Sequence, residues 1–111
     1  MIEKTILDYL TARLDYPVYA ELPSPLPERF VLIEKTGSGR EDYISSAVFA
    51  LQSYGTSLYD SAGLNERVKA AMDALILLDD ICAVRLNSDY PFDDTLNHRH
   101  RYQAVYDIVH Y

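Results

Sequence analysis

Residues 29–54 read RFVLIEKTGSGREDYISSAVFALQSY and predict a β-hairpin. The first arm, residues 29–36, carries a continuous apolar run from Phe30 to Ile33, which is typical of a strand whose two faces are both covered near its start. The second arm, residues 44–54, mixes apolar and small polar side chains on both faces, so neither face is expected to be fully solvated. Residues 37–42, GSGRED, are expected to form a flexible, charged loop at the tip.

An amphipathic helix and an extended arm precede this hairpin. Residues 2–14 place apolar side chains four apart, and Pro17 disfavours helical geometry at the residue before it. Residues 18–20 can then form a short strand. The following segment, LPSPLPE at residues 22–28, has alternate prolines that remove backbone donors, so it is expected to be a stiff connector.

A second helix and two strands are expected after the hairpin. Ser57 and Asp60 have the spacing of a capping box at the helix start, and the helix should end by about Leu78. Residues 83–89 alternate like a half-buried strand, residues 90–97 are expected to be a loop, and residues 99–110 are the last strand. Alternation along this last strand predicts one face with Tyr102, Ala104, Tyr106 and Ile108 and the other with Arg101, Gln103, Val105, Asp107 and Val109. This order predicts a single α+β domain over residues 1–111, with a mostly antiparallel sheet of about four strands and two helices packed on one face.

Composition narrows the classes of function. The net charge of −7 argues against a general nucleic-acid binder, because phosphate binding needs clustered positive charge. The chain has one cysteine, so no intramolecular disulfide can form. No signal peptide opens the sequence, and no apolar run approaches the length of a membrane span, so we expect a soluble intracellular protein.

The sequence contains no visible catalytic constellation, and we predict neither an enzyme nor a cofactor. His98 and His100 would share a face of an extended strand and, with Asp93 or Asp94, suggest a metal site, but the arginines beside them oppose cation binding. Cys82 has apolar neighbours typical of an inert buried thiol. Ten tyrosines are many for this length, which fits either amphipathic sheet positions or a subunit interface.

Taken together, the segments show a recognisable layout. They are FVLIEKTG (30–37), SAVFALQSY (46–54), SLYDSAGLNE (57–66), VRLNSDY (84–90) and RYQAVYDIVHY (101–111), preceded by the helix and the proline-rich arm. This layout resembles the small tail-completion proteins of phages and prophages of Gram-positive bacteria that have long, non-contractile tails. It is similar to the tail terminator group, whose members are α+β domains that form hexameric rings.

The resemblance implies a structural protein of the virion tail or neck, assembled in the host cytoplasm. A homo-oligomeric ring, hexameric in that group, would cap the head-proximal end of the tail tube, stop its polymerisation and present a surface for joining the head. The implied partners are the chain itself, the tail tube protein and the head connector or stopper protein, with no membrane and no specific nucleic acid.

The residues themselves suggest where such contacts lie. Charged loops are expected to be exposed and to contact the tube or connector, and arginines of the strands are expected to pair with acidic residues of a neighbour. These candidates are Gly37, Ser38, Gly39, Arg40, Glu41, Asp42, Asp93, Asp94, Arg85, Arg99 and Arg101. Three alternatives stay open: a head-completion or connector protein, a small metal-dependent enzyme using His98 and His100, and a module that binds a small ligand or peptide.

Overall fold

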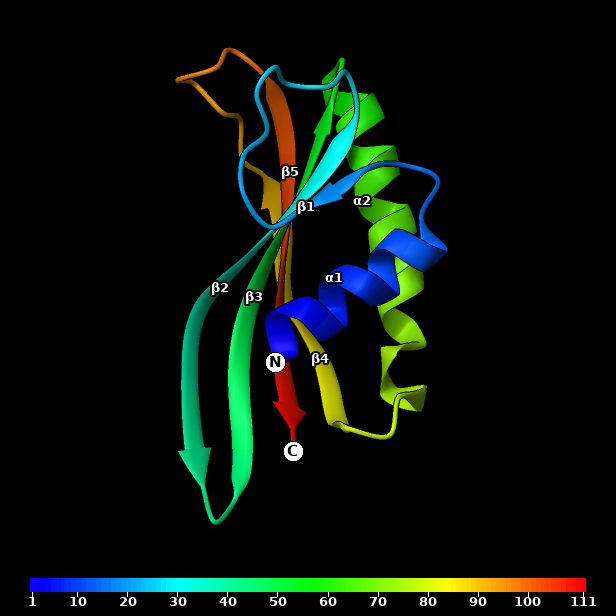
Figure 1. Cartoon of the computed structure of the whole chain (residues 1–111). Coiled ribbons are helices and arrows are strands. Elements are labelled where there is room, and N and C mark those ends of the chain that lie inside the picture. The colour runs from blue at the N-terminus through cyan, green and yellow to red at the C-terminus, as the bar shows by residue number, and fades with distance from the viewer.

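The structure, a computed structural model, describes residues 1–111 as an α+β fold (Figure 1). The elements are α1 (Ile2–Arg13), β1 (Val18–Tyr19), β2 (Phe30–Glu41), β3 (Ile44–Gly55), α2 (Leu58–Asp73), the 3₁₀ turn η1 (Leu75–Leu77), β4 (Ile81–Pro91) and β5 (His100–His110). The predicted order of elements and the fold class are confirmed. The sheet has five strands, because β1 joins it, where about four were expected.

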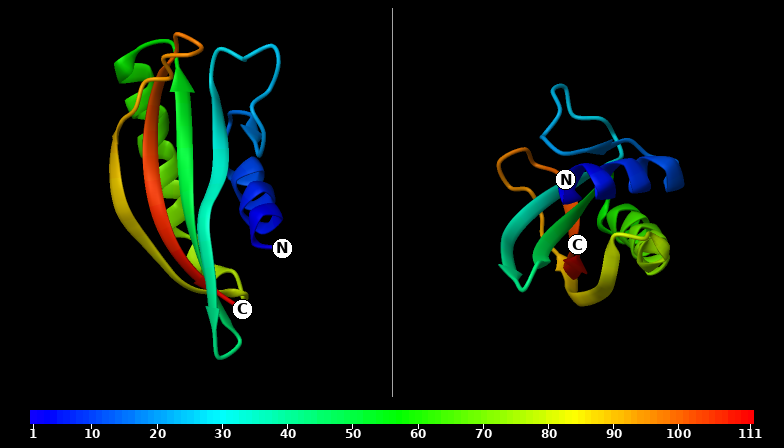
Figure 2. Two further views of the ribbon diagram at one scale, coloured as in Figure 1. Left: turned by 90° about the vertical axis from the view of Figure 1, so that its left-hand side faces the viewer. Right: turned by 60° about the horizontal axis from the view of Figure 1, so that its bottom comes forward.

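The strands lie in the order β1-β2-β3-β5-β4. Only the short β1 runs parallel to its neighbour, and every other pair is antiparallel. Both helices cover the same face of the sheet, as Figures 1 and 2 show. We call this the helix face and the opposite one the open face.

One hydrophobic core lies between the sheet and the two helices. Ile6 and Leu10 of α1 and Val68 of α2 are fully buried in it against strand residues such as Phe49. The two helices are also joined directly, since the Tyr9 hydroxyl donates to the Ala71 carbonyl at 2.6 Å. Alternation along β5 agrees with its predicted faces: Ala104, Tyr106 and Ile108 are buried on the helix face.

The tip of the β2–β3 hairpin differs from the prediction. Residues 37–42 do not form a loop, because β2 continues to Glu41 and pairs with β3 as far as Ile44. The turn consists of Asp42 and Tyr43, both with positive φ (50° and 68°), as two-residue hairpin turns of type I′ require. The glycine-containing segment is extended because β3 supplies backbone partners along its whole length, and the hairpin projects beyond the helices (Figure 1).

The junction between β3 and α2 follows the predicted capping. Ser57 is the N-cap of α2, and its hydroxyl accepts a hydrogen bond from the Asp60 backbone N–H at 3.0 Å. Gly55 precedes this cap in close contact with it, since a Cβ at that position would lie 2.6 Å from the backbone nitrogen of Ser61. The absence of a side chain at Gly55 therefore lets the chain turn directly from strand into helix.

Two details of the C-terminal half correct the predictions. β4 is longer than expected and includes Tyr90 and Pro91, because β5 pairs with it over that range. Cys82 is exposed, not buried, because it occupies a position where the register between Ile81 and Ala83 shifts. No helix of the chain is long and apolar enough to cross a bilayer.

Candidate assembly interface

One end of the open face is closed by loops. Phe30 and Tyr54 stack there with ring centroids 4.3 Å apart and are almost fully buried, although both side chains point away from the helices. The connection between β1 and β2 (residues 20–29), which contains the proline-rich segment 22–28 and is called the arm below, and the loop at residues 92–99 lie at this end (Figures 1 and 2). The sequence predicts a stiff connector for the first segment and an exposed charged loop for the second, so their contacts decide which candidate residues remain available.

Asp94 is the centre of a buried polar cluster at this end. Its carboxylate accepts hydrogen bonds from the Tyr54 hydroxyl at 2.9 Å and from the Asn97 side-chain amide at 2.8 Å. Burial acts to raise the pKa of Asp94, but these hydrogen bonds and the nearby Arg101 outweigh it, so the pKa lies below its ordinary value. Asp94 is only 7% exposed, so the expectation that it offers an exposed contact is wrong.

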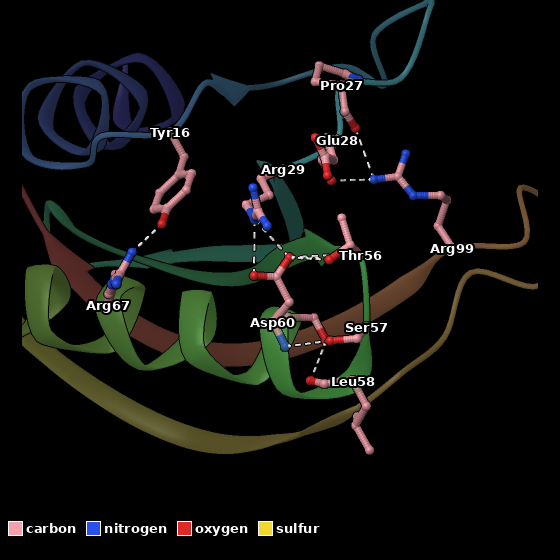
Figure 3. Close-up of polar contacts among 11 residues, drawn as sticks. Tyr16, Pro27, Glu28, Arg29, Thr56, Ser57, Leu58, Asp60, Arg67 and Arg99 are labelled. Atoms are coloured by element: carbon pink, nitrogen blue, oxygen red, sulfur yellow. Dashed lines mark hydrogen bonds and ion pairs between the residues drawn. The ribbon is translucent and has the colours of Figure 1, made fainter.

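Arg99 and Arg101 hold the same end together. Arg99 donates from Nη2 to the carbonyls of Pro27 at 2.9 Å and Glu28 at 2.6 Å, which ties the arm to the loop (Figure 3). Arg101 donates to the Phe92 carbonyl at 2.7 Å and lies over the ring of that residue. Both guanidinium groups already have partners within the chain, which the sequence did not show.

A second tie fixes the arm to the start of α2. Arg29 forms an ion pair with Asp60 at 2.9 Å, and Asp60 also accepts from the Thr56 backbone N–H at 2.8 Å (Figure 3). The hydrogen bond from Thr56 is the largest cause that lowers the pKa of Asp60, and the bond from Arg29 adds to it. Nearby, Arg67 donates to the Tyr16 hydroxyl, which joins α2 to the segment between α1 and β1 (Figure 3).

The rest of the open face carries no covering segment. Val48, Val105 and Val109 are half-buried there by their neighbours in the sheet. Arg85 lies beside them on β4 with 77% of its side chain exposed, and its one ion pair, with Asp107, is long at 3.3 Å. Of the three arginines predicted to meet a neighbour, Arg85 is therefore the one with a largely free guanidinium group.

The hairpin tip is the other exposed candidate region. Arg40 lies over the ring of Tyr43, which is 84% exposed, and Ile44 beside it is 43% exposed. Gly37, Ser38 and Gly39 of the predicted loop are strand residues instead. Glu41 and Asp42 are exposed beside the turn. Tyr43 is not among the predicted contacts, although a large aromatic residue directly after three charged ones is a usable sign of an exposed contact.

The predicted metal-site residues do not share a strand face. His98 has a left-handed backbone (φ 54°) outside β5, so the two-residue spacing to His100 does not place both rings on one face. Asp93 is exposed, and its carboxylate lies 3.8 Å from the His100 ring. The chain contains no group of three or more histidine, cysteine or acidic side chains placed to hold a metal ion.

A comparison of the chain with protein-family models and with curated proteins finds no match.

Proposed function

We propose that this chain is a ring-forming tail terminator, which caps the head-proximal end of a phage tail tube. The support is twofold: the sequence resembles that group, and the chain has the α+β fold that the resemblance implies. The observation that carries the proposal furthest is the shape of the subunit, which is 43 Å long and 24 Å across and has a distinct exposed structure at each end.

The two ends suit two different partners. At one end, the β2–β3 hairpin presents Arg40, Glu41, Asp42 and Tyr43 on a stiff two-stranded support. At the opposite end, the loop at residues 92–99 is braced by Asp94, Arg99 and Arg101, so its exposed residues are held in place (Figure 1). A subunit of this kind can contact the tail tube with one end and the head connector with the other, while its sides meet neighbouring copies.

Tube length is the decisive measurement. The tail tube protein of the same phage is polymerised with and without this chain, and tube lengths are measured by electron microscopy. A terminator binds tube ends and prevents addition of further subunits, so we expect open-ended growth without the chain and arrested growth with it. Equal length distributions in both reactions would reject the terminator function.

A head-completion or connector protein would give a different result in the phage itself. Loss of a terminator produces abnormally long tails, whereas loss of a connector leaves normal tails and filled heads that do not join. Deletion of the gene followed by microscopy of the lysate therefore separates the two functions.

A further inference from the structure

Both edges of the sheet are open. β1 pairs with β2 only at Val31 and Leu32, so the outer edge of β2 is free of a strand partner over residues 33–41. β4 is the last strand on the other side, and no strand covers its outer edge. Unpaired strand edges carry rows of backbone donors and acceptors and are ready sites for pairing with another chain.

The two free edges lie at the same height and match in length. When the residue pairing is followed across β3 and β5, Ile33 of β2 lies at the same height as Asp89 of β4, which marks one end of the matching segments. Arg40 is level with Ile81 at the other. β2 and β4 also run in opposite directions, because three successive antiparallel pairs separate them. A second copy displaced sideways would therefore bring its β2 edge antiparallel to the β4 edge of the first copy, with the helices of both on the same side.

The charges of the two edges are opposite on the open face. Arg85 is exposed on β4, and Glu34 is exposed on β2 without an ion-pair partner in the chain. When two copies stand at the same height, Arg85 of one copy faces Gly37 of the next, which has no side chain. Glu34 of that next copy lies diagonally from Arg85, two residue pairs along the strands. Long side chains reach across such a diagonal.

The charges are also opposite on the helix face, with the signs reversed. Lys35 and Arg40 of β2 lie on this face, as the ion pair of Lys35 with Glu3 of α1 shows for the first of them. Beside β4, an open groove is lined by Glu66, Lys69 and Asp73 of α2 together with apolar side chains. Lys69 is paired with Glu66 at 2.8 Å, so the carboxylate of Asp73 is the charge left over in this groove. Burial is the main cause that raises the pKa of Tyr106 in this groove to about 12, with Asp73 adding to it and Lys69 acting against it.

The same charges oppose the pairing of two identical edges, β4 with β4 or β2 with β2. Two β4 edges would place Arg85 and the acidic groove against identical charges, and two β2 edges would do the same for Lys35 and Arg40. The arrangement thus favours pairing of β4 with β2 over pairing of either edge with itself.

We propose that the β4 edge of one copy pairs antiparallel with the β2 edge of the next copy at residues 33–40, with Glu34 diagonal to Arg85 on the open face. The inference rests on the proposed ring function and names its subunit contact. This contact uses different surfaces on the two partners, so repetition gives a closed ring when the rotation closes. The ring wall is then a continuous sheet with the helices on one side.

The test reverses the charges singly and together. Arg85→Glu, Glu34→Arg and the double variant are compared with the unaltered chain by native mass spectrometry over a concentration series. Each single reversal sets like charges against each other and should raise the concentration needed for half-assembly by about tenfold or more. The double variant restores opposite charges across the contact and should recover most of the loss.

Arg13→Glu serves as the matched control. Arg13 is an exposed cation at the end of α1, close to α2 and away from both edges, so its reversal should leave assembly unchanged. Circular dichroism and thermal unfolding confirm that each variant is folded before assembly is measured.

Each outcome bears on the proposal. Weaker assembly of both single variants with recovery in the double variant supports edge pairing. Rings that form equally well in all variants would overturn it while leaving the ring function standing. A chain that stays monomeric at every concentration, including in the presence of tube protein, also overturns it, and the tube-length experiment then decides the function separately.

Discussion

Replacement of Asp94 by alanine should destabilise the fold far more than its position in a loop implies. The change removes the acceptor of the Tyr54 hydroxyl and of two Asn97 donors, at a site that is 7% exposed. A hydrogen bond to a charged group contributes about 1.5–3 kcal/mol to stability. The Tyr54 hydroxyl still accepts a hydrogen bond from Arg101 in the variant, so we expect the free energy of unfolding to fall by about 2–3 kcal/mol. For a domain of this size, that corresponds to a fall in Tm of roughly 10 °C.

Asp93→Ala is the matched control for this experiment. It removes the adjacent carboxylate, which is exposed and has only a 3.8 Å contact with His100, so the free energy of unfolding should change by less than about 0.5 kcal/mol. Both variants are measured by urea unfolding followed by circular dichroism. Equal effects of the two substitutions would refute the assignment of Asp94 as the centre of a buried cluster.

The effect of Asp94 should also depend on pH in a defined direction. Because its pKa is lower in the folded chain than in the unfolded one, its contribution is fully present above the unfolded value, near pH 4, and is lost as pH falls through the folded value. The stability difference between the unaltered chain and Asp94→Ala should thus be constant from pH 7 to 5 and shrink below about pH 4. A difference that grows on acidification would contradict this reasoning.

Three further predictions concern the backbone and the tip. Gly55→Ala should lower the free energy of unfolding by about 1–3 kcal/mol, because the new Cβ meets the Ser61 backbone. Gly63→Ala, in the open part of α2, should raise it by about 0.5–1 kcal/mol, and thermal unfolding compares the two variants. Ser57→Ala should cost about 1 kcal/mol through loss of the N-cap, and Ser57→Gly only a few tenths, as urea titration would show. Tyr43→Gly should not lower Tm, since glycine accepts the positive φ, yet it should impair arrest of tube growth; an unimpaired variant removes the tip from the tube contact.

Residues 37–42 next to the hairpin turn show a limit of prediction from local sequence. GSGRED reads as a loop because glycine and charged residues are poor strand formers on their own. In the structure, the partner strand β3 supplies hydrogen bonds as far as Glu41, and this long-range pairing outweighs local propensity. The same reason explains why β4 extends to Pro91, since Tyr102 of β5 pairs with it there.

The candidate contact residues show the same limit, because local sequence does not reveal their partners. In the sequence, Asp93 and Asp94 look equivalent as charged loop residues, and Arg99 and Arg101 look equivalent as arginines of the last strand. Their partners come from residues far away along the chain, for example Tyr54 for Asp94 and Pro27 for Arg99, and no local pattern encodes those meetings. Only the folded chain separates the buried or fully paired members from the exposed Asp93.

What the sequence determined by itself is the class of the fold and the faces of its elements. Spacing of apolar residues placed α1, the capping box placed the start of α2, and alternation assigned the two faces of β5, because these features depend on contacts within a few residues or on a fixed side-chain period. The tertiary structure alone decided the strand order and left β2 and β4 with free edges at the same height. Strand order depends on pairing between distant segments, whose free energy is set by the assembled core and is not written in any single segment.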